Sequence, residues 1–115
     1  MILYGIANCD TVRKARKFLE TNSVMFQCHD FRKDGFALHI FNQWLESQPL
    51  DVLINKRSTS WKQLSEAQQQ GLSDGTDLSP LLEMPTLIKR PLLQTDSTLL
   101  VGFKQADYQA LLDTL

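Results

Sequence analysis

Hydrophobic residues form two different patterns in the first thirty positions of the chain. Residues 1–5 are a short apolar run that predicts a buried strand, and apolar residues then recur at helical spacing as far as about Asn22. Residues 24–31 predict a second strand. A strand, a helix and a strand in this order indicate a βαβ unit with parallel strands and a right-handed crossover. The inward stripe of the helix is Val12, Ala15, Phe18 and Leu19.

The middle of the chain, at about residues 37–89, is predicted to be mainly helical. Its first helix, 37–48, carries four apolar residues at three- and four-residue spacing and ends at Pro49. A polar, basic and hydroxyl-rich segment, 55–61, resembles an anion-binding loop more than a packing element. The other expected elements are an apolar turn at 50–54, an exposed helix at 62–71, a short helix at 78–84 and a turn at 85–89.

The last part of the chain predicts a β-hairpin and a final helix. The apolar pair at 92–93 and the segment 99–101 flank a turn at Asp96–Ser97, and 105–115 is an amphipathic helix. The order β-α-β, helical insertion, β-β-α predicts an α/β, thioredoxin-like fold with a mixed four-stranded sheet. In that arrangement the X–Pro bond before the first hairpin strand can be cis, which makes Pro91 the candidate among four prolines.

Composition changes this picture little. With 115 residues we expect a single domain, 1–115, that contains the insertion at about 37–89. The formal net charge of −1 provides no basic surface, so we expect no direct contact with nucleic acid or with a membrane. We expect no secretory signal before the first strand and expect the protein in the cytoplasm.

The most informative residue is Cys9. It lies between the first predicted strand and the helix that follows, whose cap is expected to be Asn8, Asp10 or Thr11. Free backbone amides and the macrodipole at a helix start favour negative charge, which suits a nucleophilic thiolate. Arg13 is one of four cations in the next two turns of this helix. These features predict a reactive cysteine.

The second cysteine, Cys28, falls inside the second predicted strand and is expected to be a buried structural thiol rather than a redox partner. Because the two cysteines lie on different elements, we expect them to be farther apart than the roughly 4.4–6.8 Å that a disulfide requires between Cα atoms. With His29 and His39 they lack the close pairing of ligands in a zinc site, so no metal centre is predicted.

Three segments of the chain together resemble the arsenate reductase (ArsC)/Spx family of thioredoxin-like proteins, and are similar to its YffB-like branch. The first, 4–15, reads YGIANCDTVRKA and contains Cys9. The second, 55–61, reads NKRSTSW, and the third, 84–93, reads MPTLIKRPLL. Their order and spacing cover nearly the whole chain.

In the arsenate reductases of this family, one cysteine attacks arsenate, three arginines hold the oxyanion, and glutathione with glutaredoxin completes the reduction. The resemblance makes Cys9 the nucleophile and Arg57 and Arg90 two of the arginines. No arginine follows Arg90, and Lys104 lacks the planar bidentate group of an arginine. Asp10, directly after the thiol, would repel a trivalent oxyanion.

We therefore expect an oxidoreductase that acts as a glutathione-dependent thiol/disulfide reductase through a monothiol cycle at Cys9. Glutathione would be its co-substrate, a glutaredoxin-type protein is a possible donor, and no tightly bound cofactor is expected. Arg57 and Arg90 would bind carboxylates, and the backbone at Pro91 would pair with the peptide. Asn8 would shape the loop and Arg13 would assist weakly. We expect a monomer. Arsenate reduction with an incomplete arginine set stays open.

The Spx branch implies an alternative from another class of protein. Spx proteins bind RNA polymerase and sense oxidation through a C-x-x-C switch. The corresponding residues here are 9–12, CDTV, so Val12 replaces the second thiol and this switch is excluded. Binding to RNA polymerase without the switch stays open.

Overall fold

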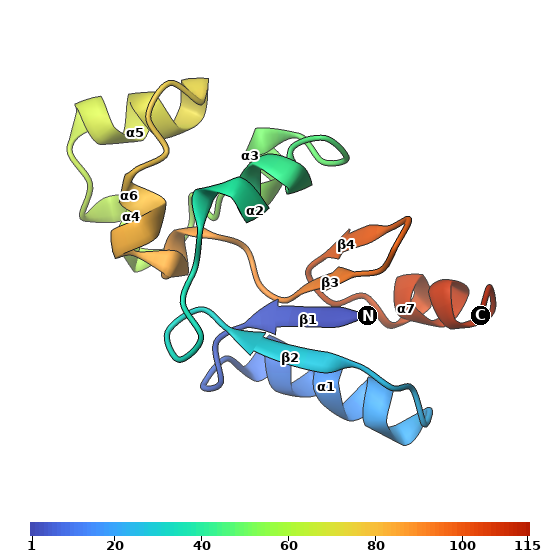
Figure 1. Cartoon of the computed structure of the whole chain (residues 1–115). Helices are drawn as coiled ribbons and strands as arrows, with labels where there is room; N and C mark the ends of the chain where they lie inside the picture. The colour runs from blue at the N-terminus through green and yellow to red at the C-terminus, as the bar shows by residue number, and fades with distance from the viewer. The chain divides into compact units, whose positions relative to one another are not determined.

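The computed structural model describes all 115 residues, which form two compact units. Met1–Asp34 and Arg90–Leu115 make up the sheet unit, and the continuous segment Gly35–Lys89 makes up the helical unit. Each unit is described separately below, and their elements are labelled in Figure 1. The expectation that both belong to one domain stays a prediction.

The sheet unit contains a mixed four-stranded sheet with the strand order β2-β1-β3-β4. The pairing of β1 with β2 is parallel, whereas β1–β3 and β3–β4 are antiparallel. This topology confirms the predicted α/β class, the βαβ unit and the C-terminal hairpin. The strands are β1 (Ile2–Gly5), β2 (Gln27–Asp30), β3 (Leu92–Gln94) and β4 (Leu99–Val101).

Two helices pack against this sheet through a shared apolar core. They are α1 (Asp10–Thr21) and α7 (Gln105–Leu112), and Figure 1 shows α1 running along β1 and β2. Alternate residues of a strand point to the same face of the sheet. The side chains on one face of the central strands β1 and β3 pack against buried side chains of the two helices. The buried core cluster consists of Leu3, Ala15, Leu19, Leu93 and Tyr108.

The second strand is shorter than the predicted range 24–31. The chain first turns after α1, where Ser23 has a φ of 57° and the Val24 amide donates to the Leu19 carbonyl at 3.0 Å. Pairing with β1 begins at Gln27, whose amide donates to the Met1 carbonyl. Only the second half of the predicted strand therefore joins the sheet.

The helical unit consists of short helices, and two of the predicted ranges differ. The first helix, predicted at 37–48, ends at Trp44. The single helix expected at 62–71 is wrong, because two serines cap two separate helices in this region. The Ser58 hydroxyl accepts from the Trp61 amide, and Ser65 forms a capping box with Gln68. The helices are α2 (Leu38–Trp44), α3 (Leu50–Leu53), α4 (Thr59–Lys62), α5 (Glu66–Asp74), α6 (Pro80–Glu83) and the 3₁₀ helix Pro85–Leu87.

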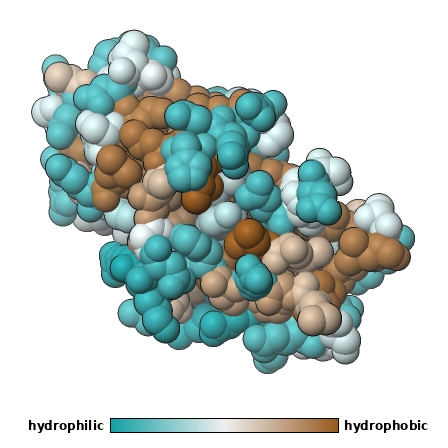
Figure 2. Space-filling view, viewed as in Figure 1, coloured by the Kyte–Doolittle hydropathy of each residue, from teal (hydrophilic) through white to brown (hydrophobic).

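The surface of each unit mixes hydrophilic and hydrophobic residues over the face shown in Figure 2. Large apolar side chains that are well exposed are Met25, Leu82 and Leu115. None of the helices combines the length and the apolar character that crossing a bilayer would require.

Candidate functional site

Cys9 is the N-cap residue of α1, at the end of the loop that follows β1. Its backbone is extended, its amide donates to the Ile6 carbonyl at 3.1 Å, and its carbonyl accepts from the Arg13 amide at 3.0 Å. The side chain makes no capping hydrogen bond and is half-buried. Cys9 therefore lies at the N-terminus of a twelve-residue helix, where the first backbone amides have no partner within the helix.

The expected caps Asn8, Asp10 and Thr11 are wrong, because the helix starts one residue after the cysteine. Asn8 is exposed in the loop, which leaves its predicted function of shaping that loop untested. Asp10 is the first helical residue and forms an ion pair with Arg13, in which both side chains are mainly exposed. In this ion pair, the negative charge of Asp10 next to the thiol and the positive charge of Arg13 offset each other.

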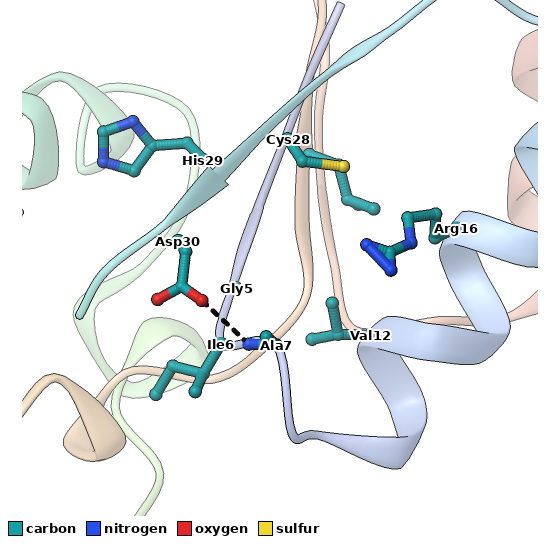
Figure 3. A pocket seen from close by; sticks show the side chains of 9 residues that line it. Gly5, Ile6, Ala7, Val12, Arg16, Cys28, His29 and Asp30 are labelled. Carbon is teal, nitrogen blue, oxygen red and sulfur yellow. Dashed lines mark hydrogen bonds between the residues drawn. The ribbon is translucent and has the colours of Figure 1, made fainter. Parts of the chain in front are cut away.

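Asp30, for which the sequence predicted no function, connects the Cys9 loop to the neighbouring strand β2 by a hydrogen bond. Its Oδ2 accepts from the Ala7 amide at 3.0 Å, across 23 positions of the chain, as Figure 3 shows. Its Oδ1 accepts from the amides of Arg32 and Lys33 at 2.8 and 3.2 Å. An aspartate at a strand end, followed by the turn residues 32–35, is the sequence signal that could have identified it.

The protonation of Asp30 responds to this arrangement. Partial burial alone would raise the pKa of the carboxyl group. Hydrogen bonds from Arg32, Lys33 and Ala7 outweigh burial, so the pKa lies below its ordinary value. Asp30 is therefore held as a carboxylate, the form that accepts bonds from all three amides.

Gly5 allows the start of α1 to approach the end of β1. A Cβ atom at this position would lie 2.6 Å from Cγ2 of Val12, closer than real Cβ contacts allow. The Gly5 carbonyl also accepts from the Phe31 amide at 2.9 Å. A glycine is thus required at the point where the strand passes into the cysteine loop.

Arg90 and Pro91 reach the same end of the sheet as Cys9. The antiparallel register pairs Tyr4 with Leu92, so residues 90–91, just before β3, lie beside the residues that follow β1. The Arg90–Pro91 peptide bond is cis, as the position of Pro91 in the predicted fold indicated. The Pro91 carbonyl accepts from the Gly102 amide at 2.7 Å. Within the sheet unit, the topology therefore brings Cys9, Arg90 and Pro91 to the same end of the sheet.

The side chain of Arg90 is half-buried, and its Nε is a buried donor without a hydrogen-bond partner. An unpaired buried N–H costs free energy unless a ligand or water accepts from it. This observation is compatible with the anion-binding function predicted for Arg90 from its sequence position.

Cys28 differs from the sequence prediction of a buried thiol. The residue is exposed because β2 is an edge strand, while its sulfur points toward Arg16 of α1 in Figure 3. Both residues line a small cavity of about 60 Å³ next to Gly5 and Val12. Burial of the sulfur in this cavity raises the pKa of Cys28, Arg16 acts in the opposite direction, and Glu20 adds to the increase. The residue as a whole is exposed, but partial burial of its thiol disfavours the thiolate.

Arg57 lies in the helical unit, in the turn before α4. Its amide donates to Oδ1 of Asn55 at 3.2 Å, and its exposed side chain lines an open pocket with Lys56 and Lys89. Lys56 belongs to the segment 55–61 that resembles an anion-binding loop, whereas Lys89 has no function predicted from the sequence. Lys104, the cation nearest to the expected position of the third arginine, is the exposed N-cap residue of α7 in the sheet unit.

Comparison with known proteins agrees with this architecture. The sequence model of the ArsC family matches residues 4–111, a range that includes every candidate site residue named above. An uncharacterized protein of Haemophilus influenzae is 46% identical over 108 residues, which are 94% of this chain and 95% of that protein. The global transcriptional regulator Spx of Lactiplantibacillus plantarum is 25% identical, over 97% of this chain and 86% of the regulator.

Solved structures give the same result. The YFFB protein superposes with a TM-score of 0.88 at 34% identity, covering 95% of this chain and 96% of that one. An arsenate reductase (ArsC) related protein from Brucella melitensis superposes with a TM-score of 0.69 at 35% identity, covering 96% and 92%. The family match over nearly the full length and the shared thioredoxin-like fold show that the chain belongs to the ArsC family.

Proposed function

We propose that the protein is a thiol/disulfide reductase that uses glutathione and a single nucleophilic cysteine, Cys9. One observation carries the proposal: Cys9 is the N-cap of α1 at the end of the sheet that also holds the cis Arg90–Pro91 bond and the unpaired buried Nε of Arg90. Helix-terminal amides favour a thiolate, and a nearby guanidinium binds carboxylates. Glutathione supplies both a thiol and two carboxylates.

The proposed cycle needs no second protein thiol. The Cys9 thiolate attacks one sulfur of a disulfide, a new S–S bond forms, and the other sulfur leaves as a thiolate. The thiolate of one reduced glutathione then attacks the substrate-derived sulfur of the mixed disulfide and releases the Cys9 thiolate. A second glutathione thiolate attacks the glutathione sulfur of the resulting glutathione–substrate disulfide, so the remaining substrate thiolate leaves and glutathione disulfide forms. Each turnover reduces one disulfide and oxidises two glutathione molecules to glutathione disulfide.

Positioning of glutathione follows from the groups at the site. Arg90 is proposed to bind one carboxylate through its unpaired N–H. The Pro91 carbonyl already accepts from Gly102, so the backbone of Arg90 is the better candidate to pair with the glutathione peptide. For Arg57, which lies in the helical unit, the family resemblance implies binding of a carboxylate, and we propose this function as well.

The test is intact mass spectrometry after incubation with glutathione disulfide and then with reduced glutathione. We expect one glutathione adduct, which reduced glutathione removes. Cys9→Ser should abolish the adduct, whereas Cys28→Ser, which removes a thiol whose burial disfavours the thiolate, should retain it. An adduct that disappears in Cys28→Ser but persists in Cys9→Ser would refute the proposal.

The proposed binding of a carboxylate by Arg90 is tested by a substitution that retains the positive charge. Arg90→Lys keeps the positive charge but loses the planar group and the Nε donor. We expect slower adduct formation that is overcome at high glutathione disulfide concentration. An unchanged concentration dependence would mean that Arg90 is structural.

A regulatory function is the second candidate. It is supported by full-length relatives described as global transcriptional regulators Spx and as the regulatory protein MgsR of Bacillus subtilis, at 23–25% identity. Under this proposal the chain binds RNA polymerase without the C-x-x-C switch, since Val12 occupies the second position. No glutathione adduct, together with slow alkylation of Cys9 near neutral pH, would favour it over the reductase.

Arsenate reduction is the third candidate and is supported by the related Brucella melitensis structure. Two features of this chain oppose it: no arginine follows Arg90, and Asp10 stands next to the thiol. Arsenate-dependent oxidation of glutathione that requires Cys9 would establish this activity.

A further inference from the structure

The pocket that contains Arg57 is lined by three cations from two segments of the helical unit that are distant in sequence. Its volume is about 390 Å³, and Lys56 and Arg57 come from the turn before α4, whereas Lys89 follows the 3₁₀ helix. The remaining lining residues are Asp51, Ile54 and Asn55.

Backbone hydrogen bonds hold the two cation-bearing segments side by side. The Asn55 amide donates to the Leu87 carbonyl at 2.7 Å, and the Lys89 amide donates to the Leu53 carbonyl at 2.8 Å. An antiparallel bridge between Ile54 and Ile88, both almost fully buried, lies between these bonds. Lys89 therefore comes from a backbone position that the core of the unit fixes next to residues 55–57.

The turn that carries Lys56 and Arg57 is ordered by its own side chains. Oδ1 of Asn55 accepts from the Arg57 amide, and the Ser58 hydroxyl donates to the Asn55 carbonyl at 2.8 Å. Nζ of Lys56 lies 5.5 Å from the centre of the Trp61 ring. These contacts restrict the conformations of the turn before a ligand binds, which lowers the entropy cost of binding.

The charge of the pocket is not neutralised within the protein. The ion pairs of the structure are Arg13–Asp10 and Arg16–Glu20, so none involves Lys56, Arg57 or Lys89. Asp51 contributes the only negative charge among the lining residues. Three cations against one carboxylate leave a net positive pocket, which attracts an anion.

We propose that Lys56, Arg57 and Lys89 form a binding site for an anionic oxygen group, in which Lys89 is a previously unassigned binding residue. A carboxylate and a phosphate share the required chemistry, since both accept several hydrogen bonds from cationic donors. The assignment of the anion as a glutathione carboxylate rests on the proposed function, whereas the anion site itself does not.

The experiment titrates the ¹⁵N-labelled protein at low ionic strength with two probes, inorganic phosphate and S-methylglutathione, which has carboxylates but no free thiol. We expect shifts in the amide signals of residues 55–57 and Lys89. Lys89→Gln should weaken binding about fivefold, the modest effect of an exposed charge contact, and Lys89→Arg should restore it. Lys62→Gln, which removes an exposed cation outside the pocket, is the matched control.

The outcomes separate the source of the anion from the site. A response to S-methylglutathione at lower concentration than to phosphate assigns the site to a carboxylate ligand, and the reverse assigns it to a phosphate. No shift at residues 55–57 with either probe, or equal weakening by Lys89→Gln and Lys62→Gln, overturns the proposal. The titration of Cys9→Ser should match that of the unmodified protein, so failure of the thiol chemistry would leave this result intact.

Discussion

The carboxylate of Asp30 joins the Cys9 loop, β2 and the turn after β2 through three backbone amides. In Asp30→Ala, these amides lose their acceptor, and we expect the free energy of unfolding to fall by about 1 kcal/mol. Hydrogen exchange should become faster at Ala7, Arg32 and Lys33. Asp96→Ala, in the exposed hairpin turn, is the control; equal exchange in both variants would contradict this interpretation.

The pH dependence of stability should report the same contact. Because hydrogen bonds lower the folded-state pKa of Asp30, the carboxylate stabilises the fold above the unfolded value of about 4. That contribution is lost as the pH falls through the folded-state value. In urea titrations, the stability difference between the unmodified protein and Asp30→Ala should therefore shrink below about pH 4. A difference independent of pH would show that the carboxylate charge is unimportant.

Tyr108 presents the opposite case of a buried polar atom that lacks a partner. Its side chain is fully buried, its hydroxyl has no hydrogen bond, and burial raises its pKa strongly. Removing the hydroxyl in Tyr108→Phe should raise the free energy of unfolding near neutral pH by about 1 kcal/mol. The unmodified protein should also lose stability above about pH 10, where tyrosine ionises in the unfolded chain, and the variant should lose less. Destabilisation by Tyr108→Phe at pH 7 would indicate a hidden partner for the hydroxyl.

The junction of β1 with α1 depends on the space between Gly5 and Val12. Gly5→Ala places a methyl group 2.6 Å from Val12 Cγ2, and we expect a loss of about 1–3 kcal/mol in chemical denaturation. The double variant Gly5→Ala/Val12→Ala removes the clash and should be more stable than additivity of the single variants predicts. Strict additivity would mean that Gly5 serves a purpose other than close packing.

Hydrophobic periodicity was sufficient to predict most elements because their core faces are regular in sequence. The helical stripe with Ala15 and Leu19 and the apolar run of β1 correspond to buried positions in the sheet unit. Contacts between segments distant in sequence were not predictable in this way. Neither Asp30 beside Ala7 nor Lys89 beside residues 55–57 has a periodic signature. Cys28 was misjudged because strand order decides whether a strand lies at an edge, and sequence alone does not determine that order.

At the scale of the whole molecule, the natural reporters are divided between the two units. Trp44 and Trp61 lie in the helical unit, whereas Cys9 and Cys28 lie in the sheet unit. If the chain is one cooperative domain, tryptophan fluorescence and cysteine alkylation should give the same urea midpoint. Separate midpoints would show that the units unfold independently and would contradict the single-domain prediction.

The central pairing of β1 with β3 has a consequence for the newly made chain. Leu3 faces Leu93, about ninety positions later, so the sheet closes around a long loop and forms slowly compared with local helices. On the ribosome, the complete helical segment emerges before the strand that completes the sheet. During that interval, one side of β1 has no partner strand, and the cysteine loop lacks the neighbouring Arg90–Pro91 segment. The nascent chain therefore carries the thiol of Cys9 before it carries the complete candidate site.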